Sequence, residues 1–136
     1  GWEWGFPAGL AETKETLIDT ARRELKEETG LEIQNVFLTS PSVYNSAGLT
    51  DEAITIMFVE ANGKISTAFQ EPNEWIEIHL FDKTQVQQLL LDAEKMPHAH
   101  KFGAKTWMVL LMFTNGGIVH TTRHCDCDFS GRYSYT

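Results

Sequence analysis

The sequence predicts a mixed fold of helices and strands, of the α/β or α+β class, in one domain. Three observations predict it: an amphipathic helix over residues 17–29, a buried strand over residues 53–61 (AITIMFVEA), and two further helices over residues 84–95 and 104–113. The chain has 136 residues, 42% of them hydrophobic, which suffices for a single packed core. Strands and helices that follow one another in this way pack as layers around that core.

The first helix is specified by its ends and by one apolar face. Thr16 is placed as the N-cap, with Asp19 three residues later in an arrangement like a capping box. Gly30 suits the left-handed position that ends a helix. The apolar face consists of Leu17, Ile18, Ala21 and Leu25.

The other elements are predicted from alternation and from turn residues. In chain order they are a strand within residues 1–9, a strand over 33–40, a loop over 41–51, a hairpin turn at Asn62 and Gly63, and a strand over 74–81. The helix over residues 104–113 is strongly apolar, so we expect it in the core. The pattern breaks at Asn115, which divides the chain into a domain over residues 1–114 and a tail over residues 115–136.

Three glutamates of the first helix are crowded together. Glu24 and Glu28 are four residues apart and stack on one line, and Glu27 flanks that line. Like charges at this spacing are destabilising, and a hard cation such as Mg²⁺ or Mn²⁺ removes the conflict. Arg23 is placed to pair with Glu27 or to reach back to Glu15 and orient its carboxylate. The pattern predicts a divalent-metal site, whereas a solvated acidic helix is the alternative.

These residues belong to a longer frame, G-x5-E-x7-R-E-L-x-E-E-x-G-L, which runs from Gly9 to Leu31. The frame resembles the Nudix box, the signature of the Nudix hydrolases. The resemblance covers residues 2–114 and implies an α/β/α sandwich with a mixed β-sheet, in which the box forms a loop–helix–loop. It also implies Glu24 and Glu28 as the main metal ligands, with Glu27 beside them. Glu15 and Arg23 are then supporting catalytic residues.

The flanks of the box resemble the ADP-ribose pyrophosphatase branch of that family. Residues 6–10 (FPAGL) match its entry segment, which implies that the Ala8 carbonyl binds metal and that Gly9 lies against the substrate. Residues 46–52 (SAGLTDE) resemble its S-P-G-(F/L)-(S/T)-x-E segment, with Ala47 where the branch has proline. We therefore expect Gly48 and Glu52 near the substrate. Tyr44, Trp75 and Phe37 are expected either to stack on a base or to be ordinary core or surface residues.

The residue that activates water has several candidates. The branch uses a glutamate on a loop before its last helix, and the matching loop here is residues 93–103, which contains Glu94. His98 and His100 share that loop, and imidazole titrates near neutral pH. Glu27 is a further candidate for the base. The alternative is that the three loop residues are simply solvated.

Composition restricts the partners. The net charge of −8 argues against broad binding to nucleic acid or acidic membranes, and it makes bound cations necessary for a polyanionic substrate. There is no apolar run long enough to span a membrane and no signal-peptide pattern, and two cysteines make no disulfide framework. We therefore expect a cytoplasmic protein. A compact group near the end, His120, His124, Cys125 and Cys127, either binds a structural metal such as Zn²⁺ or belongs to a flexible tail.

Together these features predict metal-dependent hydrolysis of the pyrophosphate bond of ADP-ribose or a related nucleoside diphosphate sugar, giving AMP and a sugar phosphate. The alternatives are another nucleotide substrate, such as a dinucleotide, NADH or a GDP-sugar, and a non-catalytic nucleotide sensor. The resembling proteins carry one or more strands before the box, and the ADP-ribose branch adds an N-terminal strand domain that helps it form homodimers and bind adenine. The box of this chain starts at residue 9, so we expect those strands to be missing because the sequence is a fragment or is renumbered; the alternative is that the C-terminal tail supplies the missing strand.

Overall fold

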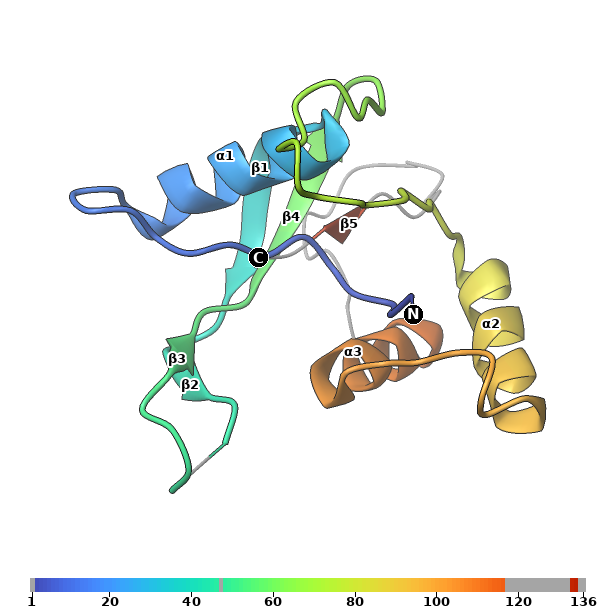
Figure 1. The fold of residues 1–136 in the computed structure, drawn as a ribbon. Helices are drawn as coiled ribbons and strands as arrows, with labels where there is room; N and C mark the ends of the chain where they lie inside the picture. Colours follow the sequence, from blue (N-terminus) through green and yellow to red (C-terminus); the bar gives the residue numbers. More distant parts are fainter. Residues whose placement is uncertain (1, 47, 117–132, 135–136) are drawn as a thin grey trace. The chain divides into compact units, whose positions relative to one another are not determined.

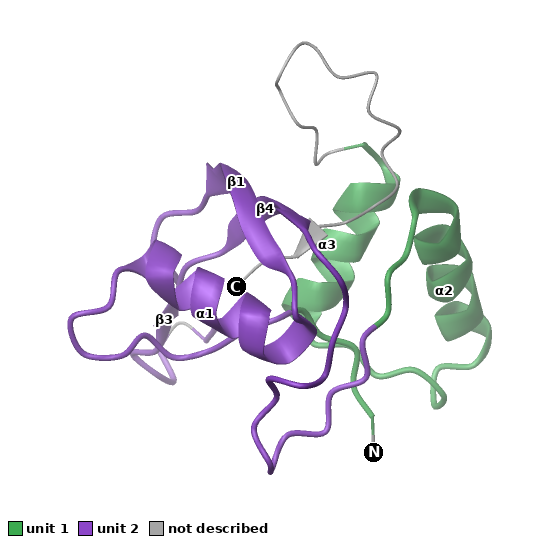
Figure 2. Ribbon diagram, turned by 90° about the horizontal axis from the view of Figure 1, so that it is seen from above, with its two compact units in different colours: residues 1–6, 79–132 green, residues 7–78, 133–136 purple. Residues whose placement is uncertain are grey.

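The computed structural model describes residues 2–46, 48–116 and 133–134. The chain divides into two compact units: unit 1 comprises residues 1–6 and 79–132, and unit 2 comprises residues 7–78 and 133–136 (Figure 2). The elements in chain order (Figure 1) are α1 (Leu17–Thr29), β1 (Glu32–Thr39), β2 (Val43–Tyr44), β3 (Ala53–Ile54), β4 (Met57–Asn62), α2 (Lys83–Lys95), α3 (Ala104–Thr114) and β5 (Tyr133–Ser134). Helices and antiparallel strands on one chain confirm the α+β class.

Unit 2 is a helix packed on a small antiparallel sheet. β1 pairs with β4 from Glu32 opposite Asn62 to Thr39 opposite Met57, with two register shifts along the way. β5 pairs with the other edge of β4, so the strand order is β1-β4-β5. β2 and β3 form a separate two-stranded ladder.

The core of unit 2 lies between α1 and this sheet. From α1 it takes Ala21 and Leu25, both almost fully buried. The sheet side and the turn before it contribute Leu31, Ile33, Met57, Val59 and Ala61. Three residues of the predicted apolar face, Ile18, Ala21 and Leu25, therefore fix the rotation of α1 about its axis, whereas the fourth, Leu17, is 52% exposed. The glutamates that border this face are held at the edge of the core, partly out of water.

The ends of α1 match the prediction. The Thr16 hydroxyl accepts a hydrogen bond from the Asp19 backbone N–H and donates one to the Asp19 carboxylate. Gly30 takes the left-handed conformation with φ of 79°. A Cβ on Gly30 would lie 2.8 Å from the Ser66 nitrogen and 2.9 Å from the Lys64 carbonyl oxygen, so glycine is needed for space as well as for φ.

Unit 1 has its own core between α2 and α3. Val86 and Leu89 of α2 and Leu110 of α3 are buried, and several partly buried residues pack against them: Trp4, Phe6, Phe81, Leu90, Phe102 and Phe113. α2 begins with a complete capping box between Asp82 and Gln85. The first residues of the chain join this unit, since Trp4 forms an isolated parallel bridge with Phe102.

Four predictions for the strands and turns were wrong. The strand over residues 53–61 is broken at residues 55–56, because Ser40 and Ile56 bond to each other there and the two halves have different partner strands. Of the strand predicted within residues 1–9, the described residues 2–9 form a single bridge, at Trp4. The turn at Asn62 and Gly63 joins no hairpin, since β4 pairs with β1 and β5.

The fourth is the strand over residues 74–81, which the structure does not contain. Burial does alternate there, with Glu74, Ile76 and Ile78 half-buried. The Glu74 N–H, however, bonds to the Glu71 carbonyl in a local turn. Alternation alone does not make a strand when no neighbouring strand accepts its backbone bonds.

The prediction that the last helix is core is correct for one side of α3 alone. Thr106, Val109 and Leu110 are buried, whereas an apolar set on the same helix is exposed: Trp107, Met108, Leu111 and Met112. A helix that is apolar all round cannot bury every face in a unit built from two helices. Within the part of the chain that the structure describes, the helices are too short or too polar to cross a membrane.

Candidate active site

Arg23 is the centre of an ion-pair network on the loop and helix that precede β1. Its Nε lies 2.8 Å from Glu15 Oε2 and its Nη2 lies 3.0 Å from Glu15 Oε1, so the pair is bidentate. Its Nη1 donates to Glu24 Oε1 at 2.8 Å and to Glu27 Oε2 at 3.3 Å. Arg23 thus makes both of the contacts that its spacing predicted. Its Nη2 also donates to the Leu10 carbonyl at 3.0 Å, which ties the loop before α1 to the helix.

Glu15 is fully committed to this network. Besides Arg23, its Oε1 accepts from the Glu12 N–H at 3.0 Å and from the Thr20 hydroxyl at 2.8 Å. These hydrogen bonds, that of Arg23 first, lower the pKa of Glu15 to about 2. Glu15 is therefore a permanent anion that orients the guanidinium, as a supporting residue should.

Glu28 has the opposite environment. The residue is 9% exposed, and its Oε2 accepts from the Ala8 N–H at 3.2 Å. Burial raises the pKa of Glu28 to about 7, and the charges of Glu24, Glu74 and Glu27 add to the rise, while the Ala8 bond opposes it. Burial likewise raises the pKa of Glu24, against its hydrogen bond from Arg23. Two shielded carboxylates therefore lie where their negative charges are unfavourable.

Position 9 requires glycine because its backbone passes very close to the Glu24 side chain. A Cβ built on Gly9 would overlap the carboxylate of Glu24. That carboxylate is held by Arg23, so it cannot move aside without breaking a 2.8 Å hydrogen bond. The glycine of the frame lets the loop backbone at Ala8 and Gly9 pass directly over the carboxylates.

The donor set suits a hard cation. Within residues 2–46, 48–116 and 133–134, no three His, Cys, Asp or Glu side chains are already grouped as a metal site. The carboxylates instead accept hydrogen bonds from the protein: Arg23 donates to Glu24 and Glu27, and the Ala8 N–H donates to Glu28. The charges of Glu24 and Glu27 nonetheless add to the raised pKa of the buried Glu28. A divalent cation relieves repulsion of this kind between carboxylates.

Glu74 is a fourth carboxylate near this group, and it was missed at the sequence level. It is half-buried, and its charge acts on both Glu24 and Glu28. The prediction of a strand over residues 74–81 concealed it. The stretch Glu71-Pro72-Asn73-Glu74 carries turn residues, and that signal would have placed Glu74 on a loop.

The candidate base Glu94 is not on a loop, contrary to prediction. It lies in the last turn of α2, which ends at Lys95, because the capped helix continues over the first residues of the expected loop. It belongs to unit 1, whereas the box belongs to unit 2. His98 follows in a turn, and His100 Nδ1 accepts from the Trp4 indole N–H at 3.2 Å. A role for these three residues in activating water stays a prediction.

The remaining predicted substrate residues lie away from α1 along the chain. Tyr44 is in β2 and exposed, while Gly48 and Glu52 lie in the loop that leads to β3. Trp75 is 83% exposed, whereas Phe37 is half-buried with its ring 6.3 Å from Phe58. Phe37 is thus packed against a protein ring. The group His120, His124, Cys125 and Cys127 lies outside the described residues.

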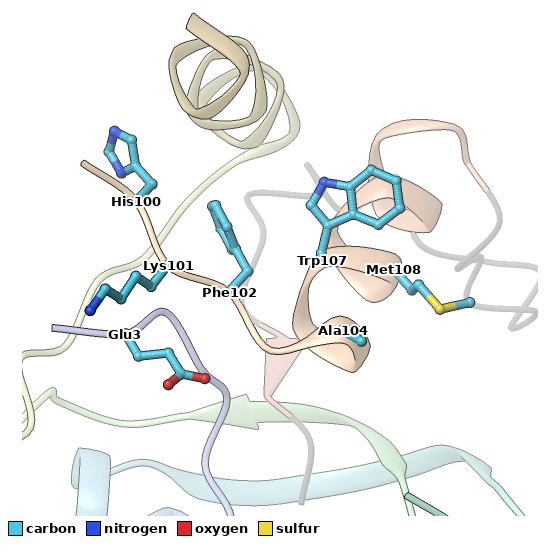
Figure 3. Close-up of a pocket in the computed structure, with 7 residues that line it drawn as sticks. All are labelled: Glu3, His100, Lys101, Phe102, Ala104, Trp107 and Met108. Atoms are coloured by element: carbon cyan, nitrogen blue, oxygen red, sulfur yellow. The ribbon is translucent and has the colours of Figure 1, made fainter. Parts of the chain in front are cut away.

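An open pocket of about 850 Å³ is found in unit 1 (Figure 3). Its lining residues are Glu3, His100, Lys101, Phe102, Ala104, Trp107 and Met108. Phe102 and Trp107 stand beside each other in this view, on the segment before α3 and on α3 itself. Of the predicted candidates for the base, His100 lines this pocket, and none of its residues comes from the box.

Comparison with known proteins agrees with the frame on α1. A family model for the NUDIX domain matches residues 1–102. The chain belongs to the Nudix family. It is 30% identical over 117 residues to an ADP-ribose pyrophosphatase of Escherichia coli, covering 80% of this chain and 53% of the relative. It is 38% identical over 78 residues to an ADP-ribose pyrophosphatase of Saccharomyces cerevisiae, covering 53% of this chain and 33% of the relative.

A nudix hydrolase of Caenorhabditis elegans is 33% identical over 86 residues, covering 63% of this chain and 36% of the relative. The Nudix chain thus spans from about a third to about half of the length of these three curated relatives. The box contains the residues of three features described above: the Arg23 network, the shielded Glu24 and Glu28, and the close passage at Gly9.

Proposed function

We propose that this Nudix chain is a pyrophosphohydrolase that cleaves the P–O–P linkage of ADP-ribose or a related nucleoside diphosphate sugar, giving AMP and a sugar phosphate. One observation carries the proposal. Glu28 is buried, accepts a hydrogen bond from the Ala8 N–H, and has a pKa raised by burial and further by the charges of Glu24, Glu74 and Glu27. The E. coli and yeast relatives named ADP-ribose pyrophosphatases support the choice of substrate.

Nudix hydrolases generally use divalent metal ions, and Mg²⁺ or Mn²⁺ fits these oxygen ligands. Glu24, Glu27, Glu28 and the Ala8 carbonyl would hold the ion. The chemistry that a bound ion would supply is neutralisation of phosphate charge and polarisation of a water molecule. Arg23 and Glu15 act differently: their bidentate pair fixes the turn of α1 that presents the glutamates.

For the base, we retain Glu27 and Glu94 and add Glu74, which acts electrostatically on both Glu24 and Glu28. Gly9 lies against the Glu24 carboxylate, so a diphosphate bound there would meet the loop backbone. Gly48, Glu52 and Tyr44 are proposed to contact the rest of the substrate. The proposal includes a cytoplasmic location, a small-molecule partner in place of nucleic acid or membrane, and a homodimer as the assembly.

A second candidate is a different nucleotide substrate, such as a dinucleotide, NADH or a GDP-sugar. It is favoured by Ala47, which stands where the ADP-ribose branch has its proline. A nucleotide sensor without catalysis is less well supported, because buried like charges are costly to a fold that has no use for them.

The test is turnover with Mg²⁺ on four substrates: ADP-ribose, NADH, GDP-mannose and a diadenosine polyphosphate. We expect ADP-ribose to be hydrolysed fastest, and Glu28→Gln to lower kcat by a factor of about 10³ or more, as expected when a charge-stabilising group is lost. Glu32→Gln is the matched control, since Glu32 is exposed and pairs with Lys26 alone among the ion pairs described. If wild-type protein binds these nucleotides without turnover, the enzymatic proposal is wrong and the sensor is favoured.

A further inference from the structure

The loop between β4 and α2 folds back onto the C-terminal end of α1. The Ser66 N–H donates to the Thr29 carbonyl at 2.9 Å. Gly30 lies close enough to Lys64 and Ser66 that any side chain there would collide with their backbone. The first part of this loop is therefore tied to the end of the box helix by backbone contacts, all within unit 2.

Gln70 makes a second attachment a few residues later. Its Nε2 donates to the Glu28 carbonyl oxygen at 2.9 Å and to the Ile76 carbonyl oxygen at 3.2 Å. The Glu28 carbonyl is one of the last four carbonyls of α1, which have no N–H donor within the helix. Gln70 is half-buried, and these bonds employ both hydrogens of its amide. One neutral side chain thus joins the backbone of Glu28 to both ends of the segment 70–76.

Glu74 lies inside the segment that Gln70 closes. A turn holds it there: the Glu74 N–H donates to the Glu71 carbonyl at 2.9 Å, and the Glu71 N–H donates to Glu74 Oε2 at 3.3 Å. Gln70 brings this segment to the Glu28 backbone, and there the charge of Glu74 contributes to the raised pKa of both Glu24 and Glu28. A second contact between this loop and α1 lies next to Gln70, where Lys26 Nζ sits 5.0 Å from the centre of the Phe69 ring.

We propose that Gln70 is a positioning residue that holds the Glu71–Glu74 turn against the C-terminal end of α1, so that the Glu74 carboxylate stays beside Glu24 and Glu28. The inference rests on the proposed function for its effect on catalysis, and on hydrogen bonds for its geometry. Gln70 touches neither metal nor substrate in this account. It acts through Glu74.

Gln70→Met is the informative variant, because methionine keeps the length of the side chain and removes both donors. Gln34→Met is the matched control: Gln34 Nε2 donates to Asn62 Oδ1 at 2.8 Å on the exposed side of β1. We expect Gln70→Met to lower kcat by about 10- to 100-fold with KM within about 3-fold, as a misplaced group near the reaction does. Gln34→Met should change neither.

Two further measurements separate positioning from a structural role. In a Glu74→Gln background, Gln70→Met should cause no further loss of kcat, since its effect passes through Glu74. Mn²⁺ affinity, followed by the electron paramagnetic resonance signal of free Mn²⁺, should weaken in Gln70→Met and Glu74→Gln by a similar factor. Gln70→Glu, which keeps the shape but loses the donors, should behave like Gln70→Met and serves if the methionine variant does not fold.

The inference is overturned if folded Gln70→Met or Gln70→Glu matches Gln34→Met in kcat and in Mn²⁺ affinity. It is also overturned if Gln70→Met lowers kcat equally with and without Glu74. An inactive wild-type protein contradicts the proposed function instead, and the Mn²⁺ affinities of the variants then decide this inference by themselves.

Discussion

Arg23 binds Glu15 through two parallel hydrogen bonds, of 2.8 and 3.0 Å, while its third nitrogen holds Glu24 at 2.8 Å. One guanidinium thereby joins a carboxylate from the loop to a carboxylate from the helix. The pKa of Glu15 falls to about 2 and that of Arg23 rises, so the pair stays ionised at any pH of interest. The charge of Glu24 is thus oriented by a group that is itself fixed.

The first prediction concerns the ability of the Arg23 guanidinium to bind Glu15 and Glu24 at the same time. Arg23→Lys keeps the charge but cannot bind Glu15 in bidentate fashion while also reaching Glu24 and Leu10. We expect a loss of about 1.5–3 kcal/mol in the free energy of unfolding, the range for hydrogen bonds to charged groups. Urea denaturation measures it. Arg22→Lys is the control, because Arg22 makes one long hydrogen bond, of 3.5 Å, to the Ile33 carbonyl. Equal losses of unfolding free energy in Arg23→Lys and Arg22→Lys would contradict the central role of Arg23 in the ion-pair network.

The second prediction is a pH dependence of stability in metal-free protein. The pKa of Glu28 is raised from 4.5 to about 7, so the folded state favours the protonated form. Stability from this group is complete below pH 4.5 and is lost as the pH rises through about 7. Thermal unfolding in chelator should show Tm falling between pH 5 and pH 8 by more in wild type than in Glu28→Gln. Parallel curves for the two proteins would contradict the burial of Glu28.

The third prediction concerns the space above Glu24. Gly9→Ala would place a methyl group on the Glu24 carboxylate and force it away from Arg23. We expect Mn²⁺ affinity to fall about tenfold or more, because one ligand is displaced, as when groups that orient a ligand are lost. Gly5→Ala is the control, since nothing lies within 4 Å of a Cβ at Gly5. Unchanged affinity in Gly9→Ala would mean that Glu24 binds no metal.

The box helix was predictable residue by residue because its signals are local. Thr16 caps it, Gly30 ends it and Leu25 buries its apolar face, and each of these effects acts within a few residues. The side-chain network followed for the same reason, since Arg23 reaches partners that the helix turn and the preceding loop bring to it.

What the sequence could not give was pairing between distant segments. Residues 74–81 alternate like a strand, yet whether they form one depends on a neighbour that the pattern does not name. For the same reason the sequence did not predict that Gln70 bonds to the Glu28 carbonyl, 42 residues away, and brings the turn that carries Glu74 to α1. The predicted helix over residues 84–95 does end at Lys95, whereas the loop predicted over residues 93–103 began too early and so included Glu94.

Anomalous diffraction from crystals soaked in Mn²⁺ tests directly whether the glutamates of α1 hold a metal ion. We expect a peak between the carboxylates of Glu24 and Glu28 and the Ala8 carbonyl, with the Ala8 N–H no longer bonded to Glu28. Soaked crystals in which Arg23 still holds Glu24, Ala8 still donates to Glu28 and no ion lies among the glutamates would contradict it.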